Sequence, residues 1–145
     1  MRLRWIFAVS LVLLLISGLA FAEIPAPAPR VKLATSDWNF GAILADRIIS
    51  HIFIIENTGQ ADLVLSAENT SCQCTTATFI IKDSPKETAD DVTVPKGGEA
   101  RLEVSLDTKN KIGQVQNAVF ITTNDPENRV IIINIKAKVK QEETK

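Results

Sequence analysis

Two cysteines one residue apart are the side chains of this chain best suited to chemistry. Cys72 and Cys74 flank Gln73, and the sequence contains no further cysteine. Neighbouring thiols can form a disulfide, exchange with other thiols, or bind a soft ion such as Cu(I). Residues two apart in a strand are separated by about 6.6 Å along its axis, whereas disulfides prefer Cα separations of about 5.5–6 Å. A bond between these cysteines therefore requires the chain to tighten into a turn.

Three interpretations of the cysteine pair stay open: a structural role, thiol–disulfide exchange, and Cu(I) binding. A bond within so short a segment is expected to be strained, and strained disulfides are the easily reduced ones, which favours exchange. The absence of a thioredoxin-like βαβ pattern argues against exchange. A structural zinc site normally needs four ligands, and besides the two thiols the chain offers one histidine, His51. A lone histidine in a predicted strand is typical of a surface or sheet-edge residue.

No other pattern of residues predicts catalysis, and no cofactor is expected apart from the Cu(I) alternative. One histidine and no Gly-x-Ser-x-Gly motif leave nothing for a hydrolase triad. Carboxylates such as Asp107 and Asp125 lie in predicted turns, where aspartate caps backbone amides more often than it binds calcium. We therefore expect no catalytic residue.

The N-terminal residues predict export. Two arginines precede an apolar run over 6–20, and residues 20–22 fit the small-x-small pattern that signal peptidase accepts. Cleavage is expected between Ala22 and Glu23, which removes a signal peptide of residues 1–22 and gives a periplasmic or secreted, extracytoplasmic protein. The alternative is an anchor formed by the uncleaved segment, whose length is close to the lower limit of about 17 residues for a membrane span.

Charge excludes one large class of partners. Cleavage of the signal peptide removes two arginines. The remaining chain has 14 basic and 17 acidic residues, and its net charge changes from −1 to −3. The remaining basic residues are scattered, without the stripe that a phosphate backbone demands. We therefore expect no nucleic acid as a partner, and contact with a membrane only if the signal peptide is retained. Free thiols are uncommon in the oxidising compartments to which export leads.

The rest of the chain predicts a small all-β domain. Residues 23–29 are a Pro/Ala linker, residues 30–140 alternate apolar and polar residues between turn signals, and residues 141–145 are a charged tail. The alternating runs are 31–35, 38–43, 48–56, 63–69, 76–81, 92–94, 102–106, 115–123 and 130–139. Seven or eight short strands, each with one apolar face that needs cover, predict a two-sheet, antiparallel, immunoglobulin-like β-sandwich.

Several short motifs, taken in order over about residues 38–139, resemble one family of bacterial domains. They include Asn39-Phe40-Gly41, Ser71-Cys72-Gln73-Cys74-Thr75, Pro95-Lys96-Gly97-Gly98 and Thr122-Thr123-Asn124-Asp125-Pro126. The chain resembles the domain of unknown function 1573 family, a group of secreted immunoglobulin-like domains related to Hydin-like modules. The positions that carry the resemblance are Phe40, Gly41, Phe53, Asn57, Gly59, Ser71, Thr75, Gly97, Asp107, Gly113, Asn124, Asp125 and Pro126.

The resemblance implies a sandwich with no established catalytic activity. The chain departs from the family at Gln73, where a small residue is usual, and in the long polar segment 82–91. Related modules serve as docking domains. We therefore expect an exported, non-catalytic module that binds an envelope protein, through a sheet edge or end loops, or serves a structural role there. The alternative is an envelope thiol-redox or Cu(I)-handling protein that uses Cys72 and Cys74.

Overall fold

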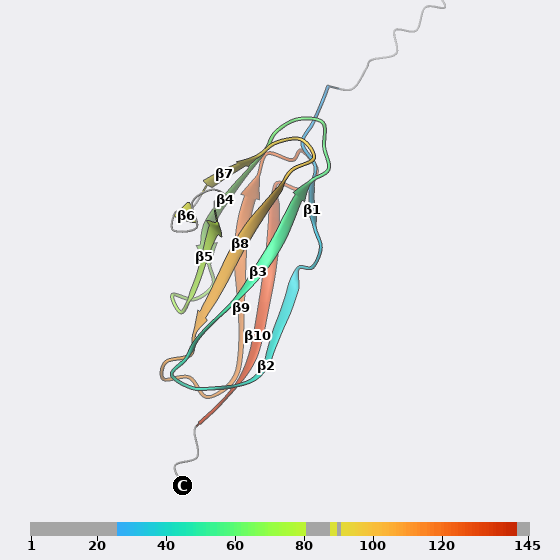
Figure 1. Ribbon diagram of the computed structural model, residues 1–145. Helices are drawn as coiled ribbons and strands as arrows, with labels where there is room; N and C mark the ends of the chain where they lie inside the picture. The colour runs from blue at the N-terminus through green and yellow to red at the C-terminus, as the bar shows by residue number, and fades with distance from the viewer. Residues whose placement is uncertain (1–25, 81–87, 90, 142–145) are drawn as a thin grey trace, which may run out of the picture.

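The computed structural model describes residues 26–80, 88–89 and 91–141, which form a two-layer β-sandwich (Figure 1). The expected signal peptide 1–22, its cleavage point at Ala22 and Glu23, and most of the charged tail lie outside the described residues. No helix in the described ranges is long and apolar enough to cross a membrane.

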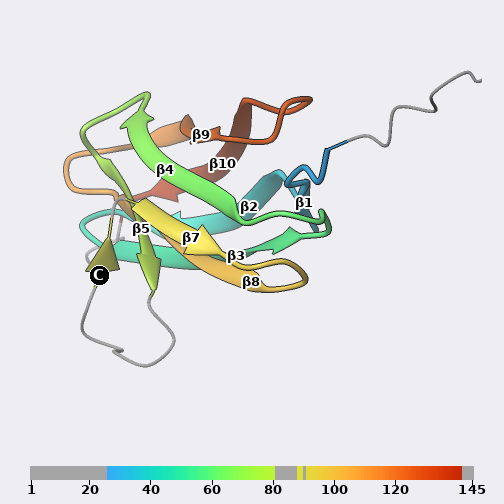
Figure 2. The ribbon, with the colours of Figure 1, turned by 90° about the horizontal axis from the view of Figure 1, so that it is seen from above.

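Ten strands make up the two sheets over the described residues. In chain order they are β1 (Val31–Leu33), β2 (Asp37–Leu44), β3 (Ile48–Asn57), β4 (Leu63–Thr70), β5 (Thr75–Ile80), β6 (Thr88–Ala89), β7 (Asp91–Val94), β8 (Glu99–Asp107), β9 (Gly113–Thr123) and β10 (Val130–Lys140). One sheet has the order β1-β3-β8-β5-β6, and we call it the first sheet. The second sheet has the order β2-β10-β9-β4-β7. Figure 2 shows the layers, with β4, β9 and β10 above β3 and β8.

The all-β sandwich confirms the predicted fold class, with two differences in detail. Ten strands replace the expected seven or eight. β6, only two residues long, lies in the polar segment 82–91, where no strand was expected, whereas β1 falls within the expected run 31–35. β2 pairs with β10 in parallel, whereas the other pairs formed by the described strands are antiparallel. This exception arises because the chain leaves the first sheet after β1 and joins the second as β2 without reversing direction.

The core lies between the sheets, where the inward residues of each strand meet. On β10 the inward side chains of Ile133, Ile135 and Val139 are buried, while Ile132 on the opposite face is exposed. Other side chains that fill this layer include Phe53, Ile55, Leu63, Leu65, Phe79, Leu102, Leu106 and Ile121. Period-two alternation thus does what the sequence predicted: it gives each sheet one apolar face, and removing those faces from water is the main driving force for the sandwich.

The end of the Pro/Ala segment is part of the domain. The amide of Gln60 donates to the carbonyl oxygen of Ala28 at 2.8 Å, and the amide of Thr58 donates to that of Arg30 at 2.9 Å. Pro29 is buried. Gly59 permits this close approach, since a Cβ there would stand 2.4 Å from the backbone nitrogen of Arg30. This end of the expected linker 23–29 therefore packs against the sandwich.

Gly59→Ala tests this close approach. The new methyl group meets backbone atoms of residues 28–30, so we expect the free energy of unfolding to fall by about 3 kcal/mol, the upper part of the usual range for overpacking. Gly97→Ala is the control, because Gly97 has φ +72° but open space around its missing Cβ. It should cost only about 1 kcal/mol, from the left-handed backbone. Equal losses in urea unfolding of the two variants would contradict the packing of residues 28–30 against Gly59.

Candidate functional site

The two cysteines lie in the turn between β4 and β5, where the chain passes from the second sheet to the first. Cys72 and Cys74 form a disulfide with their Cα atoms 5.1 Å apart. The amide of Thr75 donates to the carbonyl oxygen of Cys72 at 3.0 Å, which closes the turn. The segment thus tightens below the spacing of an extended strand, as the sequence required for a disulfide.

Hydrogen bonds to β9 and within the turn hold the disulfide in place. The amide of Ser71 donates to the carbonyl oxygen of Ala118 at 2.8 Å, and the amide of Ala118 donates to Ser71 Oγ at 2.8 Å. Thr70 Oγ1 lies 2.9 Å from the carbonyl oxygen of Cys72, to which it can donate. The disulfide is therefore fixed to the second sheet through its preceding residues.

The two sulfur atoms have different surroundings. Cys74 packs against the hydrophobic core and accepts a hydrogen bond from Asn117 Nδ2, at 3.3 Å from its Sγ. The same Asn117 Nδ2 donates to Thr75 Oγ1 at 2.8 Å. Cys72 Sγ accepts instead from the backbone amide of Cys74, at 3.1 Å. Cys74 is thus the inner sulfur and Cys72 the outer one.

Asn117 is the site residue that the sequence analysis missed. It occupies an inward position on β9 between Val115 and Val119, and only 8% of it is exposed. The available signal was a polar residue where the alternation calls for an apolar one. Buried polar side chains need hydrogen-bond partners, so this position could have been marked, although its partners on β5 could not.

His51 does not join the cysteines in a common metal site. Its ring stacks on Trp38 with centroids 3.5 Å apart, between β3 and β2. Burial lowers the pKa of His51, because it disfavours the charged imidazolium. Across the described ranges, no three side chains among His, Cys, Asp and Glu gather closely enough to hold a metal ion. In the disulfide form the cysteines also offer no thiolate to Cu(I).

Most other positions that carry the family resemblance lie in turns or at the ends of strands. Asn57, buried at the end of β3, donates from Nδ2 to the carbonyl oxygens of Ala61 and Val94 and accepts from the amide of Gly59. Asn124 Oδ1 accepts from the amide of Val64 at 2.9 Å. Positive φ angles of 74°, 72° and 93° occur at Gly41, Gly97 and Gly113. Asp107 caps the amide of Lys109, and Pro126 lies in the β9–β10 loop. Phe53 lies in the core, and the half-buried Phe40 packs against it.

Asp125 is a fully buried carboxylate that ties the N-terminal strand to the β9–β10 loop. It accepts from the amides of Val31 and Glu127, both at 2.9 Å, and from Asn128 Nδ2 at 3.1 Å. Burial by itself raises its pKa, but these hydrogen bonds and the guanidinium of Arg30, 3.7 Å away, outweigh burial. The pKa of Asp125 therefore lies below its usual value, which marks a structural carboxylate rather than a general acid.

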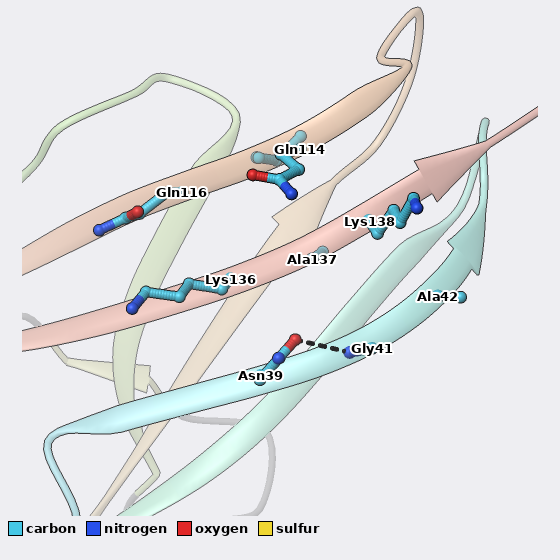
Figure 3. A pocket seen from close by; sticks show the side chains of 9 residues that line it. Asn39, Gly41, Ala42, Gln114, Gln116, Lys136, Ala137 and Lys138 are labelled. Atoms are coloured by element: carbon cyan, nitrogen blue, oxygen red, sulfur yellow. Dashed lines mark hydrogen bonds between the residues drawn. The ribbon is translucent and has the colours of Figure 1, made fainter.

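A shallow hollow of about 390 Å³ lies on the outer face of the second sheet, away from the core. It forms where the pairing of β2 with β10 shifts register between Lys136 and Lys138. Figure 3 shows its polar lining, with Asn39 Oδ1 accepting from the amide of Gly41. The other polar residues of the lining are Gln114 and Gln116 of β9. Exposed lysines and amides of this kind are typical of a solvated sheet face.

Comparisons with known proteins agree with this geometry. A family model described as "Protein of unknown function (DUF1573)" matches residues 31–139. A search of curated proteins finds no significant match.

Three solved structures with similar folds give the wider context. A protein of unknown function from Porphyromonas gingivalis W83 is 19% identical, with a TM-score of 0.61, over 82% of this chain and 51% of that one. The ASH/PapD-like domain 7 of human CEP192 is 10% identical, with a TM-score of 0.56, over 88% of this chain and 97% of that one. A family 123 glycoside hydrolase from Clostridium perfringens is 8% identical, with a TM-score of 0.58, over 79% of this chain and 27% of that one. The chain thus spans about half the length of the P. gingivalis protein, and these likenesses establish the fold alone.

The buried carboxylate of Asp125 gives a pH-dependent prediction. Because its pKa is depressed in the folded state, its contribution to stability is present above its unfolded pKa of about 3.9 and is lost as pH falls through the folded value. Asp125→Asn should lower the free energy of unfolding by about 2 kcal/mol at pH 7. The NH2 group of the new asparagine would face N–H donors that now bond to the carboxylate, and one of them would lose its acceptor. The variant should also lose less stability than the wild type between about pH 5 and pH 2.

Asp107→Asn is the control for this experiment, because asparagine keeps the oxygen that caps Lys109. Its effect in urea unfolding at pH 7 should stay within about 0.5 kcal/mol. An Asp125→Asn variant with wild-type stability and an unchanged acid profile would contradict the role assigned to Asp125.

Proposed function

We propose that this chain, which belongs to the DUF1573 family, is an exported, non-catalytic β-sandwich module that binds an extended segment of another envelope protein along the edge of β3. The family carries no established activity, and a sandwich of this kind is compatible with a binding module. The proposal rests on one sheet edge, that of β3, which is only partly paired.

β3 is only partly covered on the side away from β8. Its edge partner β1 pairs with Ile55, Glu56 and Asn57, the last three residues of the strand (Figure 1). Among the described residues, no strand pairs with the β3 segment 48–54 on that side. An uncovered edge presents unpaired backbone donors and acceptors, to which an extended chain can add as a further strand.

The uncovered part of β3 lacks the features that usually protect a sheet edge. Residues 48–55 contain no Asp, Glu, Lys, Arg, Pro or Gly, and their pairing with β8 continues without a bulge. Ile48 and Ile52 on the outer face are 75% and 43% exposed. A long, regular, uncharged edge of this kind is an aggregation hazard unless it has a partner. We infer that this edge is kept because it binds one.

The neighbouring edges are protected. β2 has Gly41 at positive φ and a register shift against β10. β7 has four residues, begins with Asp91, and covers β4 only from Leu63 to Ser66. The rest of β4 carries Glu68 at an irregular pairing with β9. Bulges, short strands and charges all discourage strand addition.

At the other edge of the first sheet, β6 pairs with β5 only at Phe79 and Ile80, which leaves the four described residues 75–78 against the seven of segment 48–54. β3 therefore offers the longer free edge.

Export rests on the N-terminal sequence pattern and is compatible with an oxidised cysteine pair. The chain recovered from the export compartment should begin at Glu23, as measured by intact mass. Ala22→Gln should block processing, because the cleavage site requires a small residue there, whereas Phe21→Leu should leave it intact. Recovery of the wild-type chain with residues 1–22 retained in the membrane fraction would contradict export as a processed protein.

The edge of β3 can be tested by cross-linking in the cell. A photoreactive residue at position 52 should yield an adduct, and one at position 132 should not. Ile52 and Ile132 are 43% and 46% exposed, on the outer faces of the first and second sheets. The cross-linked segment, made as a peptide, should slow hydrogen exchange at the amides of residues 48–54.

A charged side chain supplies the matched test of affinity for that peptide. Ile52→Lys should weaken binding at least tenfold, because a lysine on the edge discourages strand addition, whereas Ile132→Lys should leave binding unchanged. Equal losses from both variants, or protection that falls on other strands, would contradict the proposed edge.

A further inference from the structure

We propose that Cys72–Cys74 is an exchangeable disulfide that accepts two electrons from a protein dithiol, with Cys72 as the sulfur attacked and Cys74 as the leaving thiolate. This inference is independent of the binding proposed for β3. It rests on the unequal surroundings of the two sulfur atoms.

Both cysteines are half-buried, but of the two only Cys74 packs against the core. The residues on either side of Cys72 are both exposed. Cys74 is followed by the buried Thr75, and Asn117 lies against its sulfur. A thiolate must approach the sulfur it attacks, so the geometry favours attack at Cys72.

The donors around Cys74 Sγ favour its thiolate form. Asn117 Nδ2 stands 3.3 Å from Cys74 Sγ, and its second hydrogen bond, to Thr75 Oγ1 at 2.8 Å, fixes its position. The hydroxyl of Thr75 is also 3.9 Å from the sulfur. A disulfide sulfur is a weak acceptor, whereas a thiolate is a charged one, so these contacts strengthen as the S–S bond breaks. They therefore assist departure of Cys74 and lower the cost of its thiolate.

The turn keeps the two cysteines together during exchange. The paired hydrogen bonds between Ser71 and Ala118 hold the chain before Cys72 on β9. On the other side, the carbonyl oxygen of Cys74 accepts from the amide of Asp107 at 2.8 Å. Reclosure of the disulfide is then an intramolecular step with a high effective concentration.

The reaction balances with a substrate dithiol as the reductant. One substrate thiolate attacks Cys72 Sγ, the bond to Cys74 breaks, and a mixed disulfide forms while Cys74 leaves as a thiolate and takes up a proton. The second substrate thiol loses its proton and attacks its own partner sulfur, which releases Cys72 as a thiolate that is then protonated. Two electrons and two protons pass from the substrate to the protein, and the substrate gains a disulfide.

The first test locates the attack on the wild-type exported chain, with reduced glutathione as the probe. After a short reaction and acid quench, fragment mass spectrometry should find glutathione on Cys72 and a free thiol at Cys74. Equal labelling of both cysteines, labelling mainly at Cys74, or no exchange on a timescale of hours would overturn the proposal.

The second test removes the donor at Asn117. Asn117→Leu deletes the amide, and Asn117→Asp replaces it with a carboxylate that repels the leaving thiolate. Both should slow exchange with glutathione at least tenfold. They should also raise the pKa of the Cys74 thiol in the reduced protein, followed by absorbance of the thiolate. The equilibrium with glutathione should shift toward the disulfide by about tenfold, which corresponds to about 30 mV.

Gln116→Leu is the matched control, since Gln116 carries an amide on the exposed face of the same strand. It should leave the rate and the equilibrium unchanged. Unchanged exchange in a folded Asn117 variant would overturn the role of the amide. If neither Asn117 variant folds, the position of glutathione in the wild-type chain decides the proposal alone.

Discussion

The need to pair every buried polar group shapes this sandwich as much as its apolar core does. Joining two sheets encloses parts of strands and turns, and among the described residues five polar ones are buried: Asn57, Thr75, Thr108, Asn117 and Asp125. No buried side-chain nitrogen or oxygen in the described residues lacks a partner. Because an unpaired polar group costs about 1–3 kcal/mol, these side chains determine which turns approach one another. Asn57 and Asp125 fix the N-terminal segment, and Asn117 fixes the cysteine turn.

The fold could be predicted from sequence because its signals are local. Alternation on β10 and the glycines and Asx residues in the turns act within a few residues of themselves, and the resemblance over residues 38–139 agreed with them. The direction of β2 could not be predicted, since it depends on where the chain changes sheets between Leu33 and Asp37. The role of Asn117 could not be predicted either, because its partners on β5 are about 40 residues away and meet it only after both sheets form.

For function, too, the sequence carried the local signal and the folded structure supplied the rest. The sequence pointed to the Ser71–Thr75 block, and the structure shows a disulfide there, but the distinction between outer and inner sulfur comes from packing. The partly covered edge of β3 is likewise a property of topology, because β1 is short and β2 belongs to the other sheet. A run of apolar residues such as 48–55 has the same sequence whether its edge is covered or open.

Strand register relates the edge of β3 to the cysteine turn. Ile48 lies opposite Asp107, and the amide of Asp107 bonds to the carbonyl oxygen of Cys74, so the start of β3 and the cysteine turn share one row across three strands. With neighbouring strands about 4.8 Å apart, a segment docked beside β3 would run about 14 Å from β5. A thiol on that segment would need about four or five further residues of extended chain, at about 3.3 Å each, to span this gap. One ligand could therefore occupy both regions only if its cysteine lies well beyond the end of its paired strand.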